Sequence, residues 1–553
     1  MRTSSAHPSR RGAILGLVVL TSAALVLSGC AGSSSSASSS PVNGGTLTYA
    51  SGDAEPTCLD PHVGGNYPQA LISTQYLETL VGRDADGKTT PWLATKWKTS
   101  PDGLTVDFTL RSGVKFTDGT DLTADVVKAN VEHVQNPATQ SSTGYLAFQK
   151  IKSVEAVDAH TARFHLSEPD AALLESLAQP WNAIESAQAL ARPLKVNCQS
   201  PVGTGPFKVA SWQNQQAVTL VRNDHYTSPA ADATHTGNAR LKKIVWRFIP
   251  DTSTRYAALK SGEVDVIDNP QPDSVAAALK KSGNGITAVQ APRPGSVNRI
   301  ELNMSKAPFN DERVREAFVK ASPVNAGIKS LFFGTVKRSY SPLSSVEPLA
   351  YSDKSLFGTD LAQAKKLLDE AGWTVGSDGI RTKDGQRLTV QFPVSTNQSI
   401  PAEQSLFEQI QAAAKQAGFE VKLTPLDLSS WYSALAKNDY NAVSAPYTKV
   451  GPDVLRILYA SDGTKPAPSG YFANHAQIQD PQLDALLNTA ATTLSAGTRA
   501  DAVKQAQQII LRSYAILPLY DQQNNFLVGE KVQGMRINHA VSAPTFADAW
   551  LTR

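Results

Sequence analysis

The stretch Phe108-Thr109-Leu110-Arg111-Ser112-Gly113-Val114-Lys115-Phe116-Thr117-Asp118-Gly119 carries the clearest structural pattern in this chain. Large apolar side chains fall on every second residue on both sides of Arg111-Ser112-Gly113, and this alternation predicts a β-hairpin between Leu104 and Phe116. Downstream, Thr123 predicts the start of a helix, because threonine side chains cap helix N-termini. One face of this helix is expected to be buried, and it is formed by Val126, Val127, Val131 and Val134.

Outward from this stretch, strand and helix patterns alternate over most of the 553 residues without an internal repeat. Glycines that follow apolar-periodic segments predict where helices end. The predicted helices are Asp251–Lys260, Asp360–Ala371 and Ala402–Ala417, and the predicted strands include Gly45–Ala50, Val264–Ile267 and Phe419–Leu423. The alternation predicts an α/β or α+β fold class, and the length predicts two to four domains.

Residues 1–29 have the pattern of a secretory signal peptide. Arg2, Arg10 and Arg11 precede an apolar run of about 15 residues, which is shorter than the roughly 20 needed to span a bilayer. Leu27-Ser28-Gly29-Cys30 then resembles a bacterial lipobox, in which the cysteine is lipidated and becomes the mature N-terminus. Residues 30–43 are serine-rich and predict a flexible tether. We therefore expect an exported lipoprotein on the outer face of the cytoplasmic membrane, with Sec and twin-arginine export both open.

The charge balance argues against nucleic acid as a partner. The chain has 52 basic and 49 acidic residues. The three arginines of the signal segment account for the whole surplus, so the mature chain offers no basic excess for phosphate backbones. Removing Cys30 leaves Cys58 and Cys198, an even number in an oxidising compartment, and this predicts a disulfide between them. Apolar and charged contents of 41% and 18% are typical of a globular chain and too polar for a multi-span membrane protein.

Sequence signatures of catalysis are missing. Gly82-Arg83-Asp84-Ala85-Asp86-Gly87-Lys88-Thr89 matches the phosphate-loop pattern, but its two aspartates and the nearby Pro91 leave no helix N-terminus for a phosphate. The histidines are scattered, and no pattern suggests a metal or another cofactor. His62, in a Gly/Pro-containing loop, is the one histidine that we name as a candidate ligand-facing residue, and a surface or capping role is the alternative.

Several motifs, taken in order, resemble those of the family 5 extracytoplasmic solute-binding proteins of ABC importers, the dipeptide, oligopeptide and nickel receptors. Each motif alone is weak, whereas their order and spacing are specific. The resemblance covers nearly everything from Gly44 onward. The matching segments are Leu59-Asp60-Pro61, Pro91 to Trp97, Ser100 to Gly119, Gly203 to Phe207, Ser261 to Asp265, Asn303 with Pro308 to Ala317, Ala364 to Gly372, and Ile516 to Tyr520.

This resemblance implies a two-lobed fold of the periplasmic-binding-protein type II class with an extra small subdomain. Lobe I would contain residues 44–83, 199–295 and 521–553, the subdomain residues 84–198, and lobe II residues 296–520. It also implies a monomer without catalysis or cofactor, which closes around a peptide or peptide-like solute and presents it to the permease and ATPase subunits.

In peptide-binding relatives, a carboxylate just before an Asp-Pro-Asp segment binds the α-ammonium of the ligand. Here Gly451 replaces the first aspartate of that segment, and Thr448 or Lys449 stands where the carboxylate is expected. Because a lysine does not bind an ammonium group, this departure argues against free dipeptides and leaves room for a blocked peptide, an anion, a sugar or a siderophore-like compound. The expected ligand-binding residues are His62, Tyr67, Asn303, Trp431, Tyr447, Thr448, Lys449 and Asp453, with core packing the alternative for Trp431 and a solvated loop charge the alternative for Lys449.

Two other functions remain open at this point. A receptor that presents its ligand to a signalling partner would have the same sequence features as a receptor that serves a permease. A secreted hydrolase on a lipid tether would need a nucleophile, a base and an orienting group, and the sequence shows no such set.

Overall fold

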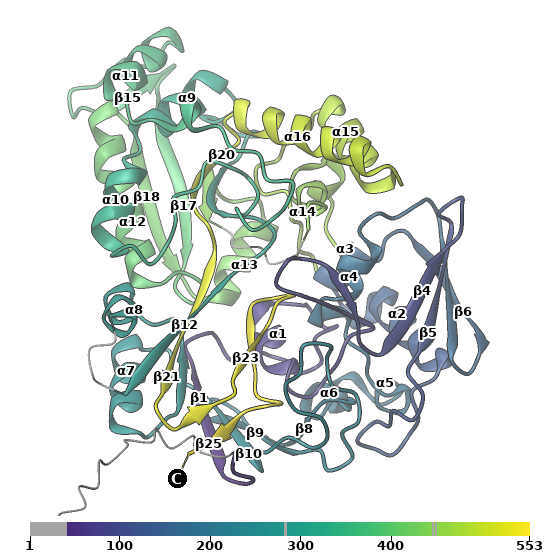
Figure 1. The fold of residues 1–553 in the computed structure, drawn as a ribbon. Coiled ribbons are helices and arrows are strands. Elements are labelled where there is room, and N and C mark those ends of the chain that lie inside the picture. The colour runs from purple at the N-terminus through teal and green to yellow at the C-terminus, as the bar shows by residue number, and fades with distance from the viewer. Residues whose placement is uncertain (1–40, 281–284, 445–446, 448, 450, 553) are drawn as a thin grey trace, which may run out of the picture. The chain divides into compact units, whose positions relative to one another are not determined.

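The computed structural model describes residues 41–280, 285–444, 447, 449 and 451–552 (Figure 1). The predicted signal segment, Cys30 and most of the serine-rich tether lie outside the described residues. Within the described part of the chain, no helix combines the length and the apolar character needed to cross a membrane.

A mixed seven-stranded sheet forms around β1 (Thr46–Ser51), which pairs in parallel with both of its neighbours. Leu47 and Tyr49 of β1 are fully buried, and the Tyr49 ring stacks on Trp246 at 3.8 Å between centroids. The sheet order is β12 (Ile286–Pro292), β21 (Gln523–Gly529), β11 (Val266–Asp268), β1, β10 (Lys243–Phe248), β9 (Ala217–Arg222) and β8 (Phe207–Gln213). Nearby helices are α1 (Tyr67–Ser73), α7 (Thr252–Ser261) and α8 (Pro272–Leu279), and two short ladders near the C-terminus join β22 (Val532–Gln533) to β25 (Trp550–Leu551) and β23 (Arg536–Asn538) to β24 (Ala543–Thr545).

A four-stranded antiparallel sheet is built from the stretch with the strong alternation. Its order is β4 (Ala94–Thr99), β5 (Thr105–Leu110), β7 (Thr161–Leu166) and β6 (Ile151–Asp158). Helix α2 (Ala124–Gln135) begins after Thr123 and buries the four predicted valines, which confirms the predicted face. Shorter helices complete this region: α3 (Thr143–Ala147), α4 (Leu173–Leu177), α5 (Ala187–Leu190) and α6 (Leu194–Gln199).

The predicted hairpin between Leu104 and Phe116 is wrong. Strand β5 pairs with β4 and β7, and the segment after Gly113 forms no strand beside it. Instead, the Phe116 amide donates to the Thr120 carbonyl and closes a local turn around Asp118-Gly119. Val114 and Phe116 alternate because both side chains enter the same core, and such burial produces the pattern of a strand without strand pairing. The phosphate-loop pattern lies in the turn between β2 (Val81–Arg83) and β3 (Thr89–Pro91), as expected for a polar turn.

A second α/β region contains three smaller sheets. One has the order β19 (Ala442–Ser444), β13 (Asn298–Leu302) and β20 (Ile516–Tyr520), and another pairs β17 (Thr389–Ser395) with β18 (Glu420–Leu426) in parallel through α12 (Pro401–Ala417). The largest apolar core lies here. The remaining elements are α9 (Glu312–Ala321), α10 (Val324–Leu331), α11 (Leu361–Glu370), α13 (Leu428–Ala436), α14 (Val454–Tyr459), α15 (Pro481–Thr492), α16 (Ala496–Arg512), and the small sheet of β14 (Thr374–Val375), β15 (Arg381–Lys383) and β16 (Gln386–Arg387).

The predicted helices in this region and in α7 are confirmed to within one residue at each end. Asp251 and Asp360 accept hydrogen bonds from backbone amides at the starts of α7 and α11. Gly418 ends α12 with a φ of 108°. A Cβ at Gly418 would lie 2.5 Å from the Arg381 Cγ atom, so both backbone conformation and space require glycine there.

The chain passes twice between the seven-stranded sheet and the β13 sheet, through residues 293–297 and through residues 521–522. The two crossings are bonded to each other: the Arg293 amide donates to the Gln522 carbonyl at 2.9 Å, and the Gln522 side chain donates to the Ser296 carbonyl at 2.9 Å. In Figure 1, β20 leads into β21, which lies beside β12.

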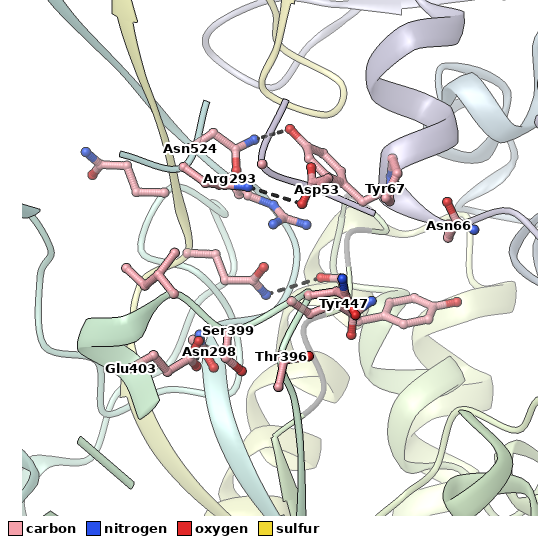
Figure 2. Close-up of a pocket in the computed structure, with 18 of the residues that line it drawn as sticks. Asp53, Asn66, Tyr67, Arg293, Asn298, Thr396, Ser399, Glu403, Tyr447 and Asn524 are labelled. Atoms are coloured by element: carbon pink, nitrogen blue, oxygen red, sulfur yellow. Dashed lines mark hydrogen bonds between the residues drawn. The ribbon is translucent and has the colours of Figure 1, made fainter. Parts of the chain in front are cut away.

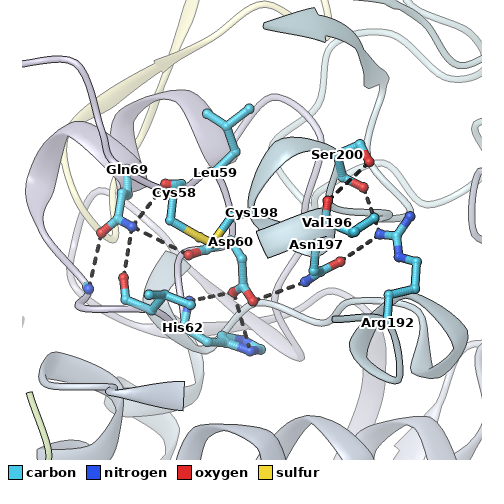
Figure 3. Close-up of a disulfide and its surroundings, with 12 residues drawn as sticks. Cys58, Leu59, Asp60, His62, Gln69, Arg192, Val196, Asn197, Cys198 and Ser200 are labelled. Atoms are coloured by element: carbon cyan, nitrogen blue, oxygen red, sulfur yellow. Dashed lines mark hydrogen bonds and ion pairs between the residues drawn. A yellow bond between two sulfur atoms is a disulfide. The ribbon is translucent and has the colours of Figure 1, made fainter. Parts of the chain in front are cut away.

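The predicted disulfide between Cys58 and Cys198 is present in the structure. It joins the loop after β1 to the end of α6, and the Leu59 amide donates to the Cys198 carbonyl beside it at 2.9 Å (Figure 3). The bridge therefore ties the region of the four-stranded sheet to the seven-stranded sheet.

We predict that replacing both cysteines, Cys58→Ser with Cys198→Ser, lowers the free energy of unfolding by about 4–5 kcal/mol. The bridge closes a loop with a sequence separation of 140, and its removal enlarges the unfolded ensemble. Urea unfolding of the variant and of the wild-type protein, both without reductant, measures the change, and nonreducing peptide mapping of the wild-type protein is the control. Equal unfolding midpoints, or two free thiols in the wild-type protein, would contradict it.

Candidate ligand-binding site

A cavity of about 570 Å³ lies where the two chain crossings meet. Its walls come from the loop after β1, the start of α1, both crossings, the segment that leads into α12, and α13 (Figure 2). This volume lies in the range typical of small-molecule sites. The charged lining residues are Asp53, Asp251, Arg255, Arg293 and Glu403.

Arg293 lies on the first crossing, and its guanidinium stacks on an aromatic ring. The Arg293 Cζ atom is 4.5 Å from the ring centroid of Tyr67. Asn524 also holds Tyr67 in place, because its Nδ2 donates to the Tyr67 hydroxyl at 2.6 Å. Burial lowers the pKa of Arg293. Since arginine stays protonated at neutral pH in any case, the cavity contains a fixed positive charge.

Asp53 lies next to this arginine and is also buried, with 8% of its surface exposed. Its Oδ1 accepts a hydrogen bond from Asn269 at 3.1 Å, whereas its Oδ2 has no hydrogen-bond partner. Burial and the nearby Asp268 raise the pKa of Asp53 to about 7, although the charge of Arg293 acts in the opposite direction. Asp268 itself accepts from the Gly52 amide at 2.6 Å and from the Tyr49 hydroxyl at 2.8 Å.

Glu403 forms a second acidic position on the wall contributed by α12. Its Oε1 accepts from the Asn298 side chain at 2.6 Å, and burial raises the pKa of Glu403 to about 7. The carboxyl groups of Asp53 and Glu403 therefore both gain or lose a proton near neutral pH.

Amide and tyrosine side chains make up much of the remaining wall. Gln522 presents a buried Oε1 without a partner, while its Nε2 donates to the Ser296 carbonyl. These groups both donate and accept hydrogen bonds, which suits a polar solute with peptide-like groups. The amides are Asn66, Asn269, Asn298, Asn397, Gln398, Gln404, Gln522, Gln523, Asn524 and Asn525, and the tyrosines are Tyr67, Tyr432, Tyr447, Tyr471 and Tyr520.

Two of the predicted ligand-binding residues, Tyr67 and Tyr447, line this cavity. Thr448 lies outside the described residues. The other predicted residues, His62, Asn303, Trp431, Lys449 and Asp453, are described and do not line it.

Trp431 and Asn303 serve the core and the backbone instead. Trp431 is 2% exposed and packs with Leu435, Tyr440 and other residues of a small core cluster, so the alternative of core packing holds. The next residue, Tyr432, lines the cavity, because successive side chains on a helix point in different directions. Asn303 donates to the Tyr440 carbonyl at 3.0 Å and accepts from the Ser305 amide at 3.1 Å, which fixes the loop after β13.

His62 is buried in a polar cluster beside the disulfide (Figure 3). Its Nε2 lies 2.8 Å from the Ala183 carbonyl, and the Asp60 carboxylate accepts from the His62 amide at 2.8 Å, from Asn197 at 3.0 Å and interacts with His133 at 3.1 Å. Burial alone would raise the pKa of Asp60, but the hydrogen bonds and the two histidines outweigh it and lower that pKa. Atoms of Asp60, His62 and His133 that could bind a metal ion lie within 4.8 Å of one another. The Asp60 oxygens already accept hydrogen bonds within the protein.

Lys449 and Asp453 form a buried ion pair outside the cavity. The Lys449 Nζ lies 2.6 Å from Asp453 Oδ2, and Arg456 Nε lies 2.9 Å from Asp453 Oδ1. The alternative of a solvated loop charge is therefore wrong, since Lys449 is 1% exposed. Asp453 neutralises the charge of Lys449, so the argument that Lys449 excludes a free α-amine does not hold.

Sequence reasoning missed Arg293, Asp53, Glu403 and Gln522. A usable signal existed for Arg293, which stands in Ala291-Pro292-Arg293-Pro294-Gly295, just before the predicted boundary between lobes. A charged residue between two prolines at a domain crossing lies where ligand sites of two-domain proteins occur. Asp53 directly follows the first strand and carried a similar signal, whereas nothing marked Glu403 or Gln522.

We predict that Asp453→Asn lowers the free energy of unfolding by about 3–5 kcal/mol at pH 7, because it leaves the buried Lys449 and the partly buried Arg456 without their carboxylate. Burial would raise the pKa of Asp453, but Arg456 and Lys449 outweigh burial and lower it. The ion pair therefore stabilises the fold at neutral pH and loses its contribution as pH falls through and below the ordinary aspartate range. Urea unfolding at pH 7 and at lower pH should show the gap between variant and wild type narrowing. A gap that stays constant with pH, or a change in amine selectivity without loss of stability, would contradict a structural role.

Comparisons with known proteins agree on one family. The family model "Bacterial extracellular solute-binding proteins, family 5 Middle" matches residues 88–469. The glutathione-binding protein GsiB of Salmonella paratyphi A is 30% identical over 476 residues, which cover 84% of this chain and 86% of that protein. The periplasmic binding protein DppA of Helicobacter pylori, solved with the peptide STSA, has a TM-score of 0.79 at 25% identity and covers 93% of this chain and 99% of its own. AgaA of A. tumefacien R10, solved with agropinic acid, has a TM-score of 0.77 at 25% identity, covering 92% and 99%. The predicted two-lobed α/β fold is thereby confirmed.

Proposed function

The chain belongs to the bacterial extracellular solute-binding proteins of family 5, and from this premise we propose that it encloses a peptide or peptide-like solute in the cavity at its two crossings. Capture of a solute for delivery to an ABC transporter is the function of the family and of this chain, which acts outside the cytoplasm. Members of the family are transport receptors rather than enzymes. The cavity itself carries the proposal, because it combines both signs of charge with a wall of amides.

The chemistry of the wall supports a peptide-like solute. Amide side chains pair with peptide groups through one donor and one acceptor each, and tyrosines bury large area with few rotamers. Two relatives bind compounds of this kind, glutathione and the peptide STSA. The departure at Gly451 and Lys449 no longer argues against a free amine, so dipeptides and tripeptides belong among the candidate solutes.

We also propose the predicted lobes, with residues 44–83, 199–295 and 521–553 in lobe I, 84–198 in the added subdomain and 296–520 in lobe II. All seven strands of the largest sheet come from the lobe I ranges, and all four strands of the antiparallel sheet come from 84–198. The β2–β3 ladder spans the boundary at 83, so that boundary is approximate. Closure of the lobes about the crossings would then create the surface that the permease and ATPase complex recognises in a monomeric receptor.

The solute can be identified directly. We predict that native mass spectrometry of protein purified from its own host shows a bound mass in the range of small peptides, which is lost on partial unfolding and exchange. Readdition of the identified compound should raise the thermal midpoint, because a ligand that binds only the folded state stabilises it. Matched samples dialysed without readdition are the control. A bound compound without peptide-like groups, or turnover of an added ester, peptide or glycoside, would contradict the proposal.

Membrane attachment is proposed to depend on a lipid at Cys30 alone. We predict that the mature protein begins at Cys30, carries a diacylglyceryl mass and partitions into detergent. Cys30→Ser should abolish the added mass and the partitioning while leaving the disulfide and solute binding unchanged. An unmodified wild-type protein in the aqueous phase would overturn the anchor without affecting the proposed solute class.

A further inference from the structure

The cavity contains the positive charge of Arg293, which no carboxylate of the described residues pairs. Arg293 is stacked on Tyr67, and its Nε is buried without a hydrogen-bond partner. No carboxylate of the described residues lies within 4.0 Å of its nitrogen atoms, although Asp53 is close enough for each charge to affect the other. Arg293 is half-buried and its Nε is enclosed without a partner, so an anion that reaches the guanidinium from the cavity would complete its hydrogen bonding.

The neighbouring carboxylate, Asp53, also has an atom without a hydrogen-bond partner. Asp53 is more than nine-tenths buried, lines the cavity, and presents Oδ2 without a partner. Because Asn269 fills only Oδ1, a donor from the ligand is needed to complete the carboxylate.

The other charged groups at this end of the cavity make their hydrogen bonds within the protein, apart from the Arg255 Nε, which is buried without a partner. Arg255 donates to three backbone carbonyls, those of Ile249, Pro250 and Asn269. Asp268 accepts from Gly52, Ser51 and Tyr49. Asp251 caps α7 by accepting from the Thr254 amide and hydroxyl. Arg293 and Asp53 thus remain as the open pair, side by side and not bonded to each other (Figure 2).

We infer that Arg293 and Asp53 together bind a zwitterionic α-amino-acid head group, with the ligand carboxylate on Arg293 and the ligand ammonium on Asp53 Oδ2. The inference rests on the proposed function and specifies its substrate class. An ordinary α-linked peptide carries its ammonium and carboxylate at opposite ends, so it cannot present both to adjacent residues. A solute with both charges on one carbon can, and a γ-linked peptide is such a solute.

The bonding fits both partners. A guanidinium donates two parallel hydrogen bonds to a carboxylate, and the Tyr67 face holds the guanidinium plane without using its N–H groups. An ammonium donates to a carboxylate oxygen in a charge-assisted bond. The free Oε1 of Gln522, on the adjoining crossing, is a further acceptor at the same wall.

The experiment compares three probes by isothermal titration calorimetry with the full mature protein. They are S-methylglutathione, whose γ-linkage leaves the α-amino-acid head free, its N-acetyl derivative, and the isomeric α-linked tripeptide. The blocked thiol prevents exchange with the Cys58–Cys198 disulfide. We expect S-methylglutathione to bind at least about 10-fold more tightly than either of the other probes, as expected from the loss of a charge-assisted hydrogen bond.

Variants then assign each charge. Arg293→Gln and Asp53→Asn should each weaken S-methylglutathione binding by about 10- to 100-fold, and acetylation of the probe should cost little further affinity in Asp53→Asn. Arg222→Gln and Asp86→Asn remove the same charges outside the cavity and should bind like wild type. Arg293→Lys keeps the charge and should show partial loss, which serves as the second variant if Arg293→Gln does not fold.

Two outcomes would overturn the inference. One is equal affinity for the acetylated or α-linked probe, and the other is S-methylglutathione binding that is indifferent to Arg293→Gln and Asp53→Asn. If the wild-type protein binds none of the probes, the solute that stays bound after purification from the host tests the inference. A retained peptide-like solute without a free α-amino-acid group would overturn the head-group inference alone. The absence of any peptide-like solute overturns the proposed function as well.

Discussion

The hydrogen bond from the Arg293 amide to the Gln522 carbonyl joins the only two crossings, among the described residues, that connect the seven-stranded sheet with the β13 sheet. Strands β12 and β21 are antiparallel partners, and the chain leaves one and enters the other at this point. The pairing fixes the two crossings against each other, so the residues that follow them in sequence meet at one wall. Arg293, Gln522, Gln523 and Asn524 all face the cavity for this reason.

The protein treats buried charges in two different ways. Arg299 and His475 both lie beside Glu301 in the core, and Lys449 and Arg456 both lie beside Asp453 near α14. In these sets each charge has an opposite charge of the protein beside it. Asp53 is buried to a similar degree and Arg293 is half-buried, and both lie at a cavity wall. The two classes differ in whether a residue of opposite charge lies within ion-pair distance, and for Arg293 and Asp53 no such partner is found among the described residues.

Sequence patterns predicted those features that short-range physics controls. Capping by Asp251 and Asp360, and the left-handed glycine after α12, set helix ends through contacts within a few residues. The predicted hairpin after Leu104 is wrong because alternation reports burial of side chains and does not identify the partner strands, which are β4 just before β5 in sequence and the distant β7.

The site was harder to predict for the same reason. The sequence suggested that Lys449 binds a ligand, because it does not show that Asp453, four residues later, lies close enough to neutralise the lysine. Trp431 and Tyr432 are adjacent in sequence, but Trp431 is buried in a core cluster and Tyr432 lines the cavity. An error of one residue in the predicted orientation of the helix would therefore interchange their roles. Order and spacing of many weak motifs identified the family, while the cavity wall depended on which segments the fold brings together.

The disulfide has a mechanical consequence. Cys58 and Cys198 link the region of the four-stranded sheet covalently to the seven-stranded sheet, whereas its contacts with the α15–α16 region are noncovalent. These contacts include the hydrogen bond from the Ala171 amide to the Ala491 carbonyl at 2.9 Å and the ion pair between Glu175 and Arg499 at 3.2 Å. If the molecule rotates about the crossings, the covalent link would carry the four-stranded sheet along with the seven-stranded one and break the contacts with α15 and α16. Because salt screens the partly exposed ion pair between Glu175 and Arg499, higher ionic strength would weaken the arrangement that contains this pair and leave the disulfide unaffected.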